Sequence, residues 1–227
     1  MITTNLKRNI LGEIISFSFI ILVFLIAIPF YNINPEYSRK EIHIMLGFFY
    51  FIALIYFTEW YFACFGPFVF IFVNYFSVKY QLIKLMLRHR LEKKNKKYKK
   101  DYGTVYYAIS LTIITIYCWK VKKPEMGLCP FLSMAFGDGL ACVIGRLINS
   151  PYKIIFGAKK SIAGSFTMFL VSFIAFGAFF YYYNANLWLI KGWFMGLISM
   201  IIEALSPFGT DNLTVPLLDL FIISFLF

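Results

Sequence analysis

Three acidic residues lie in stretches of sequence that are otherwise apolar enough for a membrane interior. Asp138 stands between two glycines, and Glu203 and Asp211 flank a helix break at Pro207 and Gly209. An ionised carboxylate at the centre of a spanning helix costs about 2.5–3.5 kcal/mol on insertion scales, so these acids are expected to have a cationic partner. Hard carboxylate oxygens beside a polar break suit Mg²⁺, which also binds substrate phosphates. The sequence therefore predicts that Asp138, Glu203 and Asp211 are metal ligands.

The segment around Asp138 combines this acid with small residues and a later arginine. Gly137, Ala141 and Gly145 recur every fourth residue and form a ridge that lets a neighbouring helix approach closely. Arg146 follows Asp138 by about 12 Å along a helix, too far for a direct salt bridge. We expect the two side chains to bracket a bound phosphate and its metal. The alternative is that Asp138 only packs, with its carboxylate hydrogen-bonded.

A second cluster of basic and hydroxyl residues opens the next apolar run. It contains Lys159, Lys160, Ser161 and Ser165. The N-terminus of a helix presents free N–H groups and partial positive charge, so it suits phosphate oxygens, and lysines add point charges. The cluster is not a Walker A loop, because the chain contains no G-x-x-x-x-G-K-[ST]. Lysines that merely mark the membrane edge are the competing interpretation.

Further candidates lie before the second apolar run and after the break. Arg39, Lys40 and His43 fall on the same predicted membrane face as the other candidates, so we expect them to contact substrate or phosphate. Asn212 continues the polar sequence after Asp211 and is a further candidate for phosphate binding. For His43, a plain interfacial histidine is the alternative.

The composition determines which elements position these residues. The chain has 227 residues, of which 60% are hydrophobic and 21% aromatic, and its mean hydropathy is +0.73. These values are far outside the range of soluble domains. The sequence predicts an all-α, polytopic bundle of transmembrane helices, with residues 1–227 forming a single integral membrane domain.

The hydropathy pattern predicts seven or eight spans, and the basic residues orient them. A basic loop at about 79–102 carries ten Lys or Arg between Lys79 and Lys100. Placing it in the cytoplasm puts sixteen of the 22 basic residues on that side, which favours eight spans over seven. Because the loop lies between spans, we interpret it as an orientation signal that contacts anionic headgroups and not as a nucleic-acid site. The eight spans are expected at about 11–30, 44–58, 60–78, 103–119, 126–148, 161–183, 187–206 and 212–227.

Taken in order, the motifs resemble a known enzyme family. The order is R-K-x-x-H, G-T, G-D-x-x-A-x-x-x-G-R, K-S-x-x-G-S, E-x-L-S and D-N-x-x-V-P. It resembles the CTP-dependent polyprenol kinases, which include phytol and dolichol kinases and are related to phosphatidate cytidylyltransferases. The matching residues are Arg39, Lys40 and His43; Gly103 and Thr104; Gly137, Asp138, Ala141, Gly145 and Arg146; Lys160, Ser161, Gly164 and Ser165; Glu203, Leu205 and Ser206; and Asp211, Asn212, Val215 and Pro216.

The resemblance implies a multi-pass membrane enzyme of lipid metabolism that moves the γ-phosphoryl group of CTP to an isoprenoid alcohol such as phytol, a polyprenol or dolichol. Asp138 and Asp211 would bind Mg²⁺ with Glu203 in support, and His43 or one of the acids would accept the alcohol proton. The active site is expected on the cytoplasmic face. The nucleotide-binding set would be Arg39, Lys40, Arg146, Lys159, Lys160, Ser161, Ser165 and Asn212.

Three other functions stay open at this stage. A cytidylyltransferase would make a CDP-lipid, and a diacylglycerol kinase would use a different lipid acceptor. A transporter would use the acids and the broken helix as an ion pathway, but it would be expected to carry an internal repeat, and none stands out in the sequence. The sequence does not decide the oligomeric state.

Overall fold

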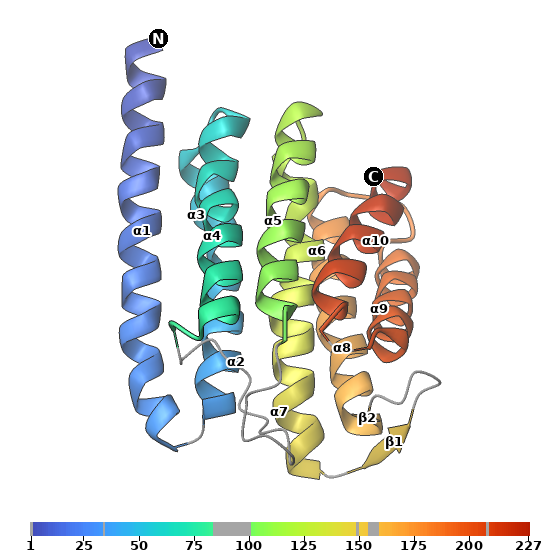
Figure 1. Cartoon of the computed structure of the whole chain (residues 1–227). Coiled ribbons are helices and arrows are strands. Elements are labelled where there is room, and N and C mark those ends of the chain that lie inside the picture. Colours follow the sequence, from blue (N-terminus) through green and yellow to red (C-terminus); the bar gives the residue numbers. More distant parts are fainter. Residues whose placement is uncertain (1, 34, 84–100, 149, 154–158, 208) are drawn as a thin grey trace.

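The computed structural model describes residues 2–33, 35–83, 101–148, 150–153, 159–207 and 209–227. The chain is a bundle of helices that run side by side, with α1 at one edge (Figure 1). The predicted all-α class is confirmed. One hairpin of two short strands, β1 (Pro151–Lys153) and β2 (Lys159–Ser161), was not expected. Most of the predicted basic loop falls on residues 84–100, which lie outside the described part of the chain.

The N-terminal half supplies one wall of the bundle. Helix α1 (Ile2–Ile33) is followed by α2 (Pro35–Met45), the 3₁₀ turn η1 (Leu46–Phe48) and α3 (Phe49–Tyr56), which succeed one another without a loop. The helical segment that contains the second predicted span, at about 44–58, begins earlier than that span, at Pro35. Pro at the first helical position loses no hydrogen bond and has a pre-set φ. As a result Arg39, Lys40 and His43 lie on a helix and not in a loop.

The remaining elements follow in sequence order. They are α4 (Trp60–Tyr80), α5 (Gly103–Lys120), η3 (Pro124–Gly127), α6 (Leu128–Leu132), a π-helical turn η4 (Ser133–Asp138), α7 (Gly139–Ile148), the hairpin, α8 (Ile162–Tyr182), α9 (Trp188–Leu205) and α10 (Asp211–Leu226).

Among the described residues, five helical stretches are long and apolar enough to cross a membrane, which supports a membrane protein. They are Thr4–Ile33, Trp60–Tyr80, Pro124–Ile148, Ile162–Tyr182 and Trp188–Leu205. The rod formed by α2, η1 and α3, together with α5 and α10, lies among these helices in the same bundle (Figure 1). Eight spans remain a prediction.

The two ends of the bundle differ in what they collect. The N-terminus and the C-terminal end of α10 point the same way (Figure 1). The opposite end carries α2, α7, the hairpin and the descending end of α4, and so most of the described residues of the predicted cytoplasmic side. The assignment of this end to the cytoplasm stays a prediction.

Glycines set the closest helix contact. A Cβ at Gly192 on α9 would lie 2.7 Å from the Cα of Gly177 on α8, and one at Gly196 would lie 2.9 Å from the carbonyl oxygen of Phe169. Small residues at such positions let helix backbones meet without side chains between them. The close approach of α8 and α9 brings the ends of both helices toward the hairpin, where the polar residues gather.

Candidate active site

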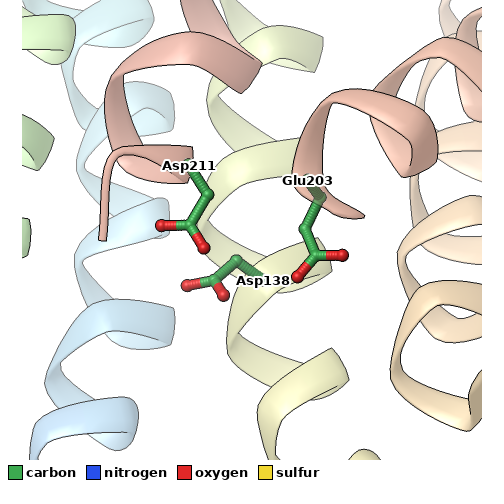
Figure 2. Close-up of side chains that lie close together, drawn as sticks. All are labelled: Asp138, Glu203 and Asp211. Atoms are coloured by element: carbon green, nitrogen blue, oxygen red, sulfur yellow. The ribbon is translucent and has the colours of Figure 1, made fainter. Parts of the chain in front are cut away.

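Three acids that are far apart in sequence meet at one point in the bundle. Asp138 ends the π turn, Glu203 lies in the last turn of α9, and Asp211 opens α10. One carboxylate oxygen from each lies within 4.8 Å of the others, and all three residues are buried. Figure 2 shows the carboxylates directed toward a common space from three different elements. The break between α9 and α10 turns the chain so that Glu203 and Asp211 face each other.

Two lysines reach into this cluster. Lys40 on α2 lies with its Nζ 2.6 Å from Oδ2 of Asp138, and Lys160 on β2 donates to Glu203 and, at 3.0 Å, to Oδ2 of Asp211. Three carboxylates therefore face two ammonium groups. Charges buried to this degree are tolerated only when paired.

The hairpin explains why Lys160 is held there. Its side chain is 15% exposed and lies outside the spanning helices. Burial lowers the pKa of this amine, but the facing carboxylates of Asp211, Glu203 and Asp138 raise it more, so the pKa of Lys160 lies above its ordinary value. Lys160 is therefore a permanent cation at this site.

His43 links α2 to both ends of the π turn. Its Nε2 lies 3.1 Å from the carbonyl oxygen of Met134 and 3.3 Å from Oδ2 of Asp138. Both neighbours are acceptors, so Nε2 must carry a proton. In a neutral imidazole this leaves Nδ1 as the nitrogen with a free lone pair. The hydroxyl of Tyr107 donates to the carbonyl oxygen of His43 at 3.2 Å and so fixes the ring from α5.

The π turn places Asp138 and its neighbours. Such turns insert one residue into a helix and are frequent at functional sites. A Cβ on Gly137 would run into the sulfur of Met168 on α8, and one on Gly164 would lie 2.8 Å from the carbonyl oxygen of Ala141. The predicted small-residue ridge thus packs against α8, as its spacing suggested. It brings α7 close enough to α8 for Asp138 to share a site with Lys160.

The other predicted phosphate-binding residues lie around this centre in varied roles. Ser161 caps α8 by accepting from the N–H of Gly164 at 2.9 Å, and Ser165 shares a 2.7 Å hydrogen bond with the hydroxyl of Tyr152. Asn212 donates to the carbonyl oxygen of Gly103 at 3.1 Å. Their part in binding phosphate stays a prediction.

The three remaining basic candidates differ in their positions. Arg146 is exposed in the last turn of α7. The side chain of Lys159 lies outside the described part of the structure. Arg39 lines a cavity together with His43. The direct pairing of Lys40 with Asp138 was not foreseen, because the two residues are 98 positions apart in the chain.

The sequence reasoning also missed two buried polar residues. Asp219 on α10 is fully buried and accepts from the hydroxyl of Ser199 at 2.9 Å. Asn74 on α4 is 2% exposed. Both stand alone in apolar sequence, which was the same signal that identified Asp138, and both should have been singled out.

Comparison with known proteins identifies the relatives of the chain. It is 33% identical over 122 residues to the phytol kinase of Synechocystis, which covers 52% of each protein. It is 29% identical over 205 residues to phytol kinase 1 of Arabidopsis thaliana, covering 82% of this chain and 64% of the relative. A chloroplastic farnesol kinase of the same plant is 30% identical over 125 residues, covering 51% of this chain and 39% of the relative.

The chain is a homologue of prenyl alcohol kinases. The resemblance derived from the motifs is thereby confirmed. The chain spans about half the length of the Synechocystis relative and somewhat less than two thirds of the length of phytol kinase 1. No family model matches the chain, and no solved structure matches it.

Proposed function

We propose that the chain is a membrane-bound phosphotransferase that moves the γ-phosphoryl group of a nucleoside triphosphate, CTP in the first instance, to an isoprenoid alcohol. One observation carries the proposal: the convergence of Asp138, Glu203 and Asp211 beside two lysines, of which Lys40 is buried and Lys160 is 15% exposed. The homologues, named phytol kinase and farnesol kinase, supply the acceptor class.

The donor set fits a hard divalent cation. Three carboxylate oxygens lie within 4.8 Å of one another, and Oε2 of Glu203 is buried without a hydrogen-bond partner among the described residues. Asp138, Glu203 and Asp211 would hold Mg²⁺, which prefers such ligands together with substrate phosphates. When bound, the ion would neutralise charge on the triphosphate oxygens during transfer.

The lysines complete the charge balance. In the structure Lys40 and Lys160 neutralise the carboxylates themselves. With a cation on the carboxylates, the same two ammonium groups become free to donate to phosphate oxygens, as buried lysines do at other phosphate sites. Lys160 on the hairpin and Lys40 on α2 approach the cluster from different elements, so they would hold the triphosphate between them.

The chemical step needs alignment and one proton acceptor. The alcohol oxygen bonds to the γ-phosphorus, the bond from that phosphorus to the bridging oxygen breaks, and the nucleoside diphosphate leaves with the electron pair. His43 accepts the alcohol proton on Nδ1, while Asp138 stabilises the resulting imidazolium through Nε2. We expect this reaction at the cytoplasmic face, because the positive-inside rule assigns the basic loop between the third and fourth predicted spans to that side.

Purified full-length protein in lipid vesicles provides the test. It is given CTP, ATP or UTP, each labelled at the γ-position, and in parallel CTP labelled at the α-position, together with phytol, farnesol, geranylgeraniol, diacylglycerol or phosphatidate. Label in a prenyl phosphate is expected. Label only from α-labelled CTP would indicate a cytidylyltransferase, and labelled phosphatidate would indicate a diacylglycerol kinase.

Asp138→Asn and Asp211→Asn test the assigned metal ligands. Loss of even an outer partner of a metal typically costs about 10–100-fold, so loss of a ligand is expected to lower kcat/KM by at least about 100-fold. Glu125→Gln is the matched control, because Glu125 lies in η3 at the opposite end of the bundle. Wild-type turnover in both aspartate variants would overturn the assignment.

A further inference from the structure

A polar cavity lies beside the acid cluster and contains unsatisfied hydrogen-bonding atoms. It is lined by residues of α2, α4, α5 and α10, among them His43, Asn74, Thr104 and Asn212. Within the described residues, Oδ1 of Asn74, Oγ1 of Thr104 and Oδ1 of Asn212 are buried and have no hydrogen-bond partner. Asn74 and Asn212 are only 2% and 4% exposed. Leaving a buried polar group unpaired costs about 1–3 kcal/mol, so such atoms indicate a missing hydrogen-bonding group.

A second cavity, called the upper cavity, adjoins the first, called the lower cavity, and has an entirely apolar surface. Its lining comes from α1, η1, α3, α4 and α5 and includes Phe49, Gly66 and Leu111. The two cavities share three lining residues, Leu46, Phe70 and Tyr107, so they are adjacent. The hydroxyl of Tyr107 donates to the backbone carbonyl oxygen of His43, and Tyr107 lines both cavities.

Three helices change from polar to apolar in the same direction along this pair of cavities. On α4, Asn74 is followed toward the membrane interior by Phe70 and then Gly66. On α5 the order is Thr104, Tyr107 and Leu111. Steps of three and four residues keep these side chains on one helix face, over about 10–12 Å of rise.

The α2–η1–α3 rod repeats the pattern. His43 is followed by Leu46 and then by Phe49. An amphiphile with one polar end and one long apolar chain matches this gradient, and its polar end would lie next to the carboxylate of Asp138.

We propose that the two cavities are the binding site for the acceptor, a long-chain prenyl alcohol. This inference rests on the proposed kinase function. The hydroxyl group lies in the lower cavity, where it donates to the amide oxygen of Asn74 or Asn212 before its proton passes to His43. The prenyl chain passes Leu46, Phe70 and Tyr107 into the upper cavity. Each cavity is only about 20 Å³, so the chain enters by displacing the side chain of Phe70, which is partly exposed and lines both.

Other occupants fit less well. A nucleotide base has polar edges that the upper cavity cannot pair, and burying them there would be unfavourable. A water molecule fits the lower cavity, but it would not account for the apolar cavity beside it.

Photo-crosslinking locates the occupant. Full-length protein in vesicles is irradiated with a farnesol analogue that carries a diazirine on the prenyl chain, and the modified residues are mapped by mass spectrometry. Labelling is expected on α4, η1–α3 and α5, at residues such as Phe70, Phe49 and Leu111, and unlabelled geranylgeraniol should compete for it. Labelling that maps to other helices, or that CTP displaces, would overturn the inference.

Variants of the upper and lower cavities give an independent readout. A Cβ on Gly66 would meet nothing closer than Phe49 at 3.9 Å, so Gly66→Leu places its added carbons in the apolar cavity. The ratio of kcat/KM for geranylgeraniol to that for geraniol is expected to fall at least about tenfold. Asn74→Leu is expected to raise the KM for every prenyl alcohol about tenfold, while the KM for the nucleotide changes less than that for the alcohol.

Gly177→Leu is the matched control, because a Cβ there also meets nothing closer than 4.0 Å, but on α8 away from both cavities. An unchanged chain-length ratio in Gly66→Leu would contradict the proposed tail site. Failure of the function and failure of the site are distinguishable. Crosslinking to these helices without any phosphorylation would refute only the kinase proposal, whereas prenyl phosphorylation with labelling elsewhere would refute only the acceptor site.

Discussion

Replacement of Lys160 by methionine separates its role as a counter-charge from its role toward substrate. The side chains of Lys160, Glu203 and Asp211 are 15%, 5% and 10% exposed, so the variant leaves two buried carboxylates without this partner. Breaking a buried pair by removing one member costs about 3–5 kcal/mol. For a chain of this length, 1 kcal/mol corresponds to about 2–4 °C in Tm. We therefore expect Lys160→Met to melt about 6–20 °C below the wild type without divalent cations.

Magnesium should reverse much of this loss. In the wild type Mg²⁺ must displace the Lys160 ammonium from Glu203 and Asp211, which are two of the three proposed metal ligands. In the variant these two carboxylates have already lost that ammonium. A cation at 100 times its Kd stabilises by about 2.7 kcal/mol, so Mg²⁺ should raise the Tm of Lys160→Met by about 5–10 °C and that of the wild type by less. Turnover should fall even at saturating Mg²⁺, because the triphosphate loses a cation.

The assay is thermal melting in detergent with added EDTA or Mg²⁺, alongside prenyl kinase activity. Lys120→Met is the control: this lysine lies over the ring of Trp60 at 4.8 Å, at the other end of the bundle. The raised pKa of Lys160 fixes the pH dependence as well. Stability from a raised amine pKa is fully present below the unfolded value of about 10.4 and is lost only as pH rises through the folded value, so the Tm gap should be constant between about pH 6 and 9. Equal magnesium shifts in both proteins would refute the reasoning.

Two further substitutions test the packing that supports the site. Gly192→Ala should lower the free energy of unfolding by about 1–3 kcal/mol, because the new Cβ would lie 2.7 Å from the Cα of Gly177, a backbone atom that cannot move aside as a side chain can. Gly66→Ala should be tolerated, since its Cβ meets nothing closer than 3.9 Å. Equal melting temperatures of the two variants would show that α8 and α9 are not so close. Asp219→Ala should cost about 1–3 kcal/mol through loss of the hydrogen bond from Ser199, while Asp219→Asn, which keeps an acceptor, should lose less in the same melting assay; no difference between them would argue against this buried bond.

Much of the site followed from residue types alone. An acid in apolar sequence is costly enough to mark a functional position, and this identified Asp138, Glu203 and Asp211 before any geometry was known. The all-α class and the membrane setting followed from hydropathy. The same signal is present at Asp219 and Asn74, but neither residue lies beside a glycine or proline that would mark close packing or a helix break.

The tertiary structure decided which residues are partners. Lys40 and Asp138 lie 98 positions apart, and their contact depends on the packing of α2 against the π turn, which local periodicity cannot reveal. Likewise, the hairpin directs Lys160 at Glu203 and Asp211, although its sequence looked like a simple helix start. The extension of the second helix back to Pro35 places His43 beside a cavity instead of in a loop. Hydropathy reports the free energy of leaving water residue by residue, so it selects the membrane-embedded helices and the exceptional polar positions in them. Distances between side chains depend on how those helices pack, and a single sequence does not encode that in any local pattern.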